Sequence, residues 1–149
     1  MLLFLDIDGV LHPHVVYDQG LLLTHRPALE AVLRALPVVD IVISSTWRTT
    51  RTLAELRALF SEDIAPRIVS VTPQWTEVQG DDSWGTYVRQ SEIEAWLRAN
   101  GRPWEEWVAL DDQPALFRPF CKNLVRTCAE TGLDEATCVT LLERLKPQN

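Results

Sequence analysis

The chain has 149 residues, the usual size of one globular domain, because a second hydrophobic core normally requires about 250 residues or more. Hydrophobic residues make up 46% and charged residues 23% of the sequence, which excludes a disordered, collagen-like or coiled-coil chain. The formal net charge of −7 disfavours tight binding to a nucleic-acid backbone, unless a local basic patch offsets it. We therefore expect a single domain over residues 1–149.

The cysteines and the N-terminus favour a cytoplasmic protein. Cys121, Cys128 and Cys138 lack a CxxC pair and zinc-type histidine spacing, so we expect reduced thiols. The apolar run Met1–Leu5 is far shorter than the roughly 18 residues of a spanning helix. We therefore expect neither a signal peptide nor a membrane anchor.

The first part of the chain alternates apolar strands with a helix. Residues Leu2–Leu5 are apolar at consecutive positions, which is typical of a parallel strand covered on both faces. Residues 10–24 lack a sustained period and lead, as a loop, into a helix that begins near Pro27. After this helix, the β-branched run Val38–Ile43 predicts the second strand.

A second helix and a third strand follow. Thr52 and Glu55 have the spacing of a capping box, and the apolar residues after them are Leu53, Leu56, Leu59 and Phe60. Ile68–Val71 predicts the third strand. The segment Thr72–Val88 has no clear period, and whether it acts as a lid stays open. Its aromatic residues, which would either stack on a nucleobase or pack against the fold, are Trp75, Trp84 and Tyr87.

The last part of the chain predicts two more helices and two more strands. A helix ends at Asn100-Gly101, and strands follow at Trp107–Leu110 and Asn123–Thr127. Asp134 caps a final helix, with the apolar residues Val139, Leu142 and Leu145 facing inward. Strands separated by helices need crossover connections, so the fold class is α/β, with three α/β/α layers around a parallel sheet of about five strands.

Three of these strands end in acid or hydroxyl side chains. The residues are Asp6, Asp8, Ser45, Thr46, Asp111 and Asp112. Because the carboxyl ends of parallel strands meet at one edge, we expect the three groups to lie together. Two carboxylates about 4 Å apart repel by about 4 kcal/mol at an effective dielectric of 20, so the cluster needs a cation or a proton. Oxygen ligands favour Mg²⁺, which typically keeps water and a substrate phosphate as its other ligands.

The residues that carry this chemistry match a known family. Asp6-Ile7-Asp8-Gly9-Val10-Leu11, Ile43-Ser44-Ser45 and Leu110-Asp111-Asp112 resemble, in chain order, motifs one, two and four of the haloacid dehalogenase-like (HAD) hydrolases. The resemblance covers nearly the whole chain and implies a Rossmannoid fold, here without room for a large cap domain. Ser45-Thr46-Trp47-Arg48 and Arg89-x-x-Glu92-Ile93-x-x-Trp96-Leu97 look like a small subgroup found alone or inside RNA-repair proteins.

The resemblance implies a role for each acid. Asp6 would be the nucleophile and a metal ligand, and Asp8 the general acid/base and a metal ligand through its backbone carbonyl. Asp111 would bind Mg²⁺ with help from Asp112, although a turn or cap role suits Asp112 nearly as well. The implied reaction is Mg²⁺-dependent hydrolysis of phosphomonoesters through an aspartyl-phosphate.

Other residues are expected to contact the phosphate. Ser45 would hydrogen-bond the transferring group, with Ser44 as the alternative, and the further candidates are Gly9, Thr46 and Arg48. Arg89 stands where the family usually has a lysine that offsets the phosphate charge, with Arg67 and Lys122 as alternatives. Arg48 and Arg51 would reach a remote phosphate, but for Arg51 we favour a surface ion pair with Glu55. His12 and His14 follow the nucleophile loop without an evident partner.

We expect a phosphatase whose substrate is a small molecule or an exposed phosphate on a macromolecule. Two other functions compete with this interpretation. One is nucleic-acid end-processing, such as removal of a 3′-phosphate, which the net charge disfavours. The other is a non-catalytic phosphate-binding or signalling module, because receiver domains also gather acids, a hydroxyl and a basic residue on a parallel sheet. Receivers place the acidic pair after the first strand and the nucleophile after the third, an order that this chain reverses.

Overall fold

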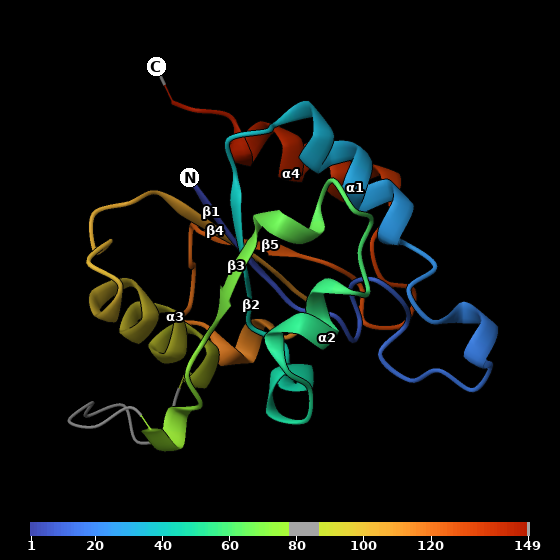
Figure 1. Cartoon of the computed structure of the whole chain (residues 1–149), viewed down its shortest axis with the longest axis horizontal. Coiled ribbons are helices and arrows are strands. Elements are labelled where there is room, and N and C mark those ends of the chain that lie inside the picture. The colour runs from blue at the N-terminus through green and yellow to red at the C-terminus, as the bar shows by residue number, and fades with distance from the viewer. Residues whose placement is uncertain (78–86, 149) are drawn as a thin grey trace.

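A parallel sheet of five strands, in the order β3-β2-β1-β4-β5, forms the centre of the protein (Figure 1). The computed structural model describes residues 1–77 and 87–148. All neighbouring strands pair in parallel. The strands are β1 (Leu2–Leu5), β2 (Asp40–Ile43), β3 (Ile68–Val71), β4 (Trp107–Asp111) and β5 (Leu124–Arg126). The predicted parallel α/β sheet is therefore confirmed.

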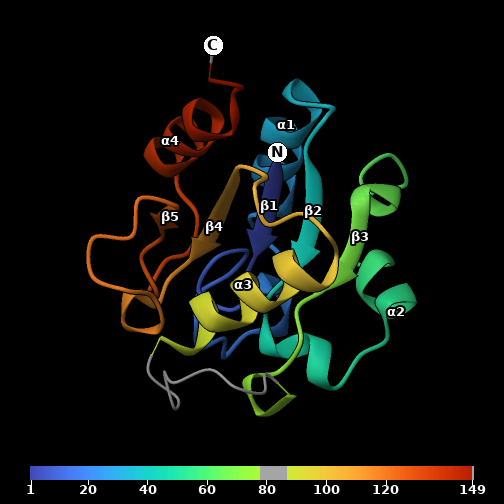
Figure 2. The same ribbon diagram turned by 90° about the vertical axis from the view of Figure 1, so that its left-hand side faces the viewer.

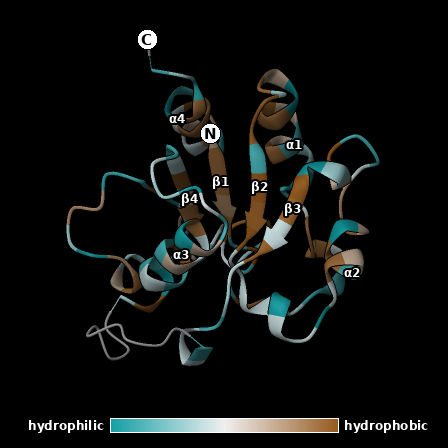
Figure 3. Cartoon of the chain, turned by 60° about the vertical axis from the view of Figure 1, so that its left-hand side comes forward, coloured by the Kyte–Doolittle hydropathy of each residue, from teal (hydrophilic) through white to brown (hydrophobic). Residues whose placement is uncertain are grey.

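Helices cover both faces of this sheet, which gives the predicted three layers. They are α1 (Arg26–Ala35), α2 (Leu53–Arg57), α3 (Val88–Ala99) and α4 (Glu135–Leu145). Apolar side chains of α1, α2 and α4 form one core with the sheet, and those of α3 form a second core on the opposite face (Figure 2). The central strands are hydrophobic along most of their length (Figure 3), as expected for strands buried on both faces. Within the described ranges, no helix is long and apolar enough to cross a membrane.

Two element boundaries and the buried face of the last helix differ from the sequence prediction. Val38 lies before β2 and is 70% exposed, so β-branching alone extended the predicted strand too far. The capping box of Thr52 and Glu55 is present, but α2 already ends at Arg57. Val139 is 53% exposed, because α4 turns Leu141 and Leu145, one turn apart, into the core instead.

Strand register places the polar strand ends beside one another. Leu5 of β1 pairs with Ile43 of β2 and with Leu110 of β4, so the next residues, Asp6, Ser44 and Asp111, lie level across the sheet. The residues two positions earlier, Phe4, Val42 and Ala109, all pack in the α3-side core. Because side chains along a strand alternate between faces, Asp6, Ser44 and Asp111 lie on this same side.

No large cap covers this edge of the sheet in the described residues. Residues 7–25 contain one short 3-10 helix, Gln19–Leu21, and the segment after β3 contains another, Trp75–Glu77. The rest of the segment predicted as a possible lid, residues 78–86 with Trp84, lies outside the described residues. The fold is thus a small HAD-like Rossmannoid sheet.

Candidate active site

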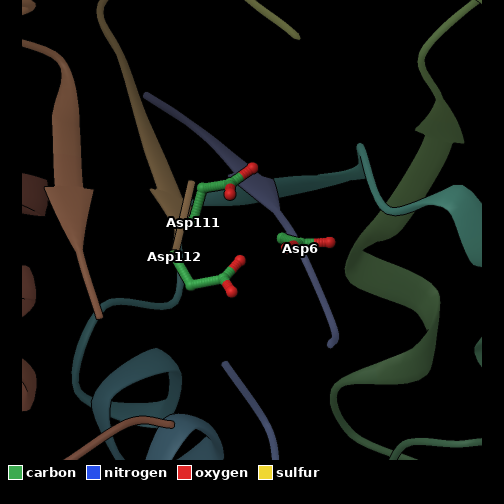
Figure 4. Close-up of side chains that lie close together, drawn as sticks. All are labelled: Asp6, Asp111 and Asp112. Carbon is green, nitrogen blue, oxygen red and sulfur yellow. The ribbon is translucent and has the colours of Figure 1, made fainter. Parts of the chain in front are cut away.

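Three buried carboxylates meet at the carboxyl ends of β1 and β4. One carboxylate oxygen from each of Asp6, Asp111 and Asp112 lies within 4.8 Å of the other two (Figure 4). Asp6 directly follows β1, Asp111 is the last residue of β4, and Asp112 follows it. Residues more than 100 positions apart in the sequence are therefore brought into one cluster, as the parallel register requires.

Burial and the neighbouring charges raise the pKa of two of these carboxyl groups. Desolvation, followed by the negative charge of Asp111, raises the pKa of Asp6 well above its ordinary value. Desolvation likewise raises the pKa of Asp111 to about 6, and the positive charge of Arg89 opposes this shift. The carboxylates thus favour any ligand that brings positive charge between them.

The oxygen atoms of the cluster suit a divalent cation. Asp111 Oδ1 accepts a hydrogen bond from the backbone N–H of Gln113 at 2.9 Å. Asp111 Oδ2 and both carboxylate oxygens of Asp112 are buried and have no hydrogen-bond partner among the described residues. His14 Nδ1 lies 3.2 Å from Asp112 Oδ2, an ion-pair distance without hydrogen-bond geometry. Buried oxygens without donors are costly, and a hard metal ion would satisfy them.

Gly9 lets Asp112 reach the cluster. Its φ of +76° is a conformation that favours glycine, and a Cβ at this position would lie 2.1 Å from Asp112 Oδ2. The Thr127 hydroxyl donates a 2.6 Å hydrogen bond to the Gly9 carbonyl and holds this loop against β5. Gly9 therefore makes room for a carboxylate, while its predicted contact with phosphate stays a prediction.

Asp8 lies beside the cluster, with its side chain held by two donors. Trp47 Nε1 donates to Asp8 Oδ2 at 3.0 Å, and His12 Nε2 lies 2.7 Å from Asp8 Oδ1. His12 Nδ1 accepts a 3.1 Å hydrogen bond from the Leu23 N–H, so the proton of the neutral imidazole is on Nε2, which donates to Asp8. The Asp8 side chain remains 34% exposed.

Arg89 brings a positive charge to the carboxylates from the first turn of α3. Its Nε lies 3.6 Å from Asp111 Oδ2, and its Nη1 donates to Glu92 Oε1 at 2.8 Å. The buried Nε has no hydrogen-bond partner among the described residues. Arg67, an alternative for this role, instead donates to the carbonyls of Leu33, Leu36 and Val39.

Arg48, predicted to contact phosphate, is hydrogen-bonded within the fold. Its Nε and Nη1 donate to the carbonyls of Thr72, Ser44 and Ser45. Its Nη2 donates to the Pro73 carbonyl and, at 2.6 Å, to Glu92 Oε2. These bonds use every N–H of the guanidinium and tie the ends of β2 and β3 to α3, while the contact of Arg48 with phosphate stays a prediction.

Ser44 and Ser45, the two candidates for the phosphate contact, have different surroundings. The Ser45 hydroxyl accepts a 3.2 Å hydrogen bond from the Trp47 N–H and caps the 3-10 helix Thr46–Thr49. Ser44 shares the Asp6 side of the sheet, and the Thr46 side chain is exposed. Because the Ser45 hydroxyl is engaged in this cap, Ser44, the alternative, becomes the better candidate for the phosphate contact.

Arg51 does not form the predicted ion pair with Glu55. Glu55 Oε1 instead accepts a hydrogen bond from the Thr52 N–H in the capping box. The Arg51 guanidinium carbon lies 3.9 Å above the centroid of the Trp47 ring, the geometry of a cation–π contact.

Sequence reasoning alone missed the roles of His12, Trp47 and Glu92. His12 stands four residues after Asp8, a spacing that could have suggested their contact. No local pattern pairs Trp47 with Asp8 or joins Glu92 to two arginines, since these contacts form only in the tertiary structure.

The comparisons with known proteins agree with this geometry. Residues 2–138 match the family model described as a HAD domain in Swiss Army Knife RNA repair proteins. Searches of curated proteins and of solved structures gave no match. The matched region spans nearly the whole chain and includes the three carboxylates, Arg89 and Glu92. The chain therefore belongs to the family of HAD domains found in Swiss Army Knife RNA repair proteins.

Proposed function

We propose that this protein is a Mg²⁺-dependent phosphatase that hydrolyses phosphomonoesters through an aspartyl-phosphate on Asp6. Family membership supports a HAD-type hydrolase, a class that typically uses a metal ion. The observation that carries the finer proposal is the buried cluster of Asp6, Asp111 and Asp112, with carboxylate oxygens that lack hydrogen-bond donors within the described structure.

The arrangement supports a two-step reaction. An Asp6 oxygen attacks phosphorus, the ester P–O bond breaks, and protonated Asp8 gives its proton to the departing oxygen. Asp8 then takes a proton from water, whose oxygen attacks phosphorus and releases phosphate from Asp6. Asp6, Asp111 and Asp112 would hold Mg²⁺, which, when bound, neutralises phosphoryl oxygens. Arg89 offsets further negative charge from the α3 side.

Hydrolysis of p-nitrophenyl phosphate, with Mg²⁺ and with EDTA, tests this proposal. We expect Mg²⁺-dependent release, and we expect Asp6→Asn to reduce kcat by about 10³-fold or more. The matched control is Asp63→Asn, because Asp63 is exposed and pairs with Arg34 away from the cluster. Activity that survives Asp6→Asn would show that Asp6 is not the nucleophile. A long-lived phosphorylated Asp6 without product release would favour a signalling module.

A second candidate function is the removal of a terminal phosphate from nucleic acid. The family description favours it, because related HAD domains occur in RNA repair proteins. The net charge of −7 opposes it unless cations gather near the site. Equal kcat/KM on free nucleotides and on oligonucleotides with a 3′-phosphate would remove its support.

A further inference from the structure

Trp47 and Arg51 follow one another beyond the proposed acid/base, Asp8. Asp8 Oδ2 accepts the indole N–H of Trp47 at 3.0 Å. The Arg51 guanidinium carbon lies 3.9 Å above the same indole, and the His12 ring centroid lies 5.7 Å from that of Trp47. One indole ring therefore separates the positive charge of Arg51 from Asp8, the group that would protonate the leaving-group oxygen.

Arg51 is available for an anion. Within residues 1–77 and 87–148 no carboxylate pairs with it, and its one hydrogen bond there is a long 3.5 Å contact with the Thr50 hydroxyl. The exposed Arg34, in contrast, forms two hydrogen bonds with Asp63. A guanidinium that stacks by its face keeps its N–H edges free, and these edges match phosphate oxygens.

The position of Asp8 fixes where the leaving group lies. A general acid must come within hydrogen-bond distance of the oxygen that it protonates, so the leaving group passes next to Asp8 and Trp47. Arg51 occupies one face of the Trp47 indole, so a base cannot stack on that face while Arg51 stays there. This subsite therefore recognises charge rather than base identity.

We propose that Trp47 and Arg51 form a leaving-group subsite that binds a second phosphate. The substrate class is a phosphomonoester whose leaving group carries a further phosphate, either the end of a polynucleotide strand or a small bisphosphate. The inference rests on the proposed phosphatase function and adds the substrate class to it. It also reconciles a strongly acidic chain with a polyanionic substrate, because a cation without a carboxylate partner among the described residues lies next to Trp47, which holds Asp8.

The test compares kcat/KM for adenosine 3′-monophosphate, adenosine 3′,5′-bisphosphate and a short single-stranded oligoribonucleotide with a 3′-phosphate. For wild type we expect a preference for the probes with additional phosphates. In Arg51→Gln this preference should fall about tenfold, and Arg51→Lys should restore part of it. For the oligonucleotide, the slope of log kcat/KM against log salt should become shallower by about 0.7, the change expected for one lost phosphate contact.

The control is Arg98→Gln, which removes the same charge from the far end of α3 and should leave the preference unchanged. A tenfold loss on the bisphosphate alone would identify a small-molecule substrate, and a loss on the oligonucleotide alone a strand end. An unchanged preference in Arg51→Gln, with Mg²⁺-dependent hydrolysis intact, would overturn this inference and leave the proposed function standing. If wild type hydrolyses none of the probes or p-nitrophenyl phosphate, both fail.

Discussion

Gly9→Ala would place a methyl group in the space that Asp112 occupies. The new Cβ would lie 2.1 Å from Oδ2, 2.3 Å from Cγ and 2.9 Å from Cβ of Asp112. Because even the Asp112 Cβ is too close, rotation of the carboxylate does not relieve the collision, and the backbone must move. The φ of +76° adds a conformational cost of about 1–2 kcal/mol for any residue with a side chain.

Gly101→Ala separates these two effects. Gly101 has a similar φ of +65°, but a Cβ there would have nothing within 4 Å. We expect Gly101→Ala to lower the free energy of unfolding by about 1–2 kcal/mol, through the backbone alone. Gly9→Ala should lower it by about 1–3 kcal/mol more, the usual cost of an overpacked site.

Urea denaturation with and without Mg²⁺ measures both quantities. Mg²⁺ should stabilise wild type and Gly101→Ala alike, since binding to the folded state alone adds stability. Gly9→Ala should need about tenfold more Mg²⁺, or higher, for the same effect, because Asp112 is displaced from the cluster. Equal losses and equal Mg²⁺ dependence in the two variants would refute the argument that Gly9 makes room for Asp112.

Three other predictions follow from the site. In EDTA, the free energy of unfolding should fall as the pH rises from about 4 through about 6, because burial raises the folded pKa values of Asp6 and Asp111 and the protons that favour the folded state are lost; urea melts should show a smaller fall in Asp111→Asn, in which only Asp6 still contributes. His12→Phe should lower kcat about tenfold with little change in KM, because Asp8 loses a donor that orients it; an effect on KM alone in steady-state kinetics would contradict this. Arg48→Met should destabilise the protein by about 3–5 kcal/mol, since it leaves the buried Glu92 with one partner fewer; thermal unfolding that matches wild type would argue against the network.

The parts of the site that could be predicted from the sequence are those fixed by the strands. Asp6 and Asp111 each follow an apolar run, and parallel strands separated by helices must bring such ends to one edge. Side chains alternate between the two faces of a strand, and Ser44 is level with Asp6 across the sheet. The same reasoning would therefore have selected Ser44 over Ser45 for the phosphate contact.

The arginines could not be predicted in this way. The donors of Arg48 meet carbonyls from two strand ends and a carboxylate 44 residues away, and no local spacing reveals these partners. Arg51 has the spacing for an ion pair with Glu55, but the capping box takes that carboxylate, and the guanidinium lies over the half-buried indole of Trp47 instead. Long side chains reach across the fold, so their partners depend on the tertiary structure.

Glu92 makes the arginine at position 89 difficult to exchange during evolution. One of its oxygens accepts from Arg89 and the other from Arg48, so three side chains form a single charged unit between α3 and the strand ends. Arg89 uses one nitrogen for Glu92 while another faces Asp111, a span that the single ammonium of lysine does not cover. A lysine at position 89 would therefore leave either Glu92 or Asp111 without this positive neighbour, and the buried charges of Arg48 and Glu92 would have to be rebalanced as well.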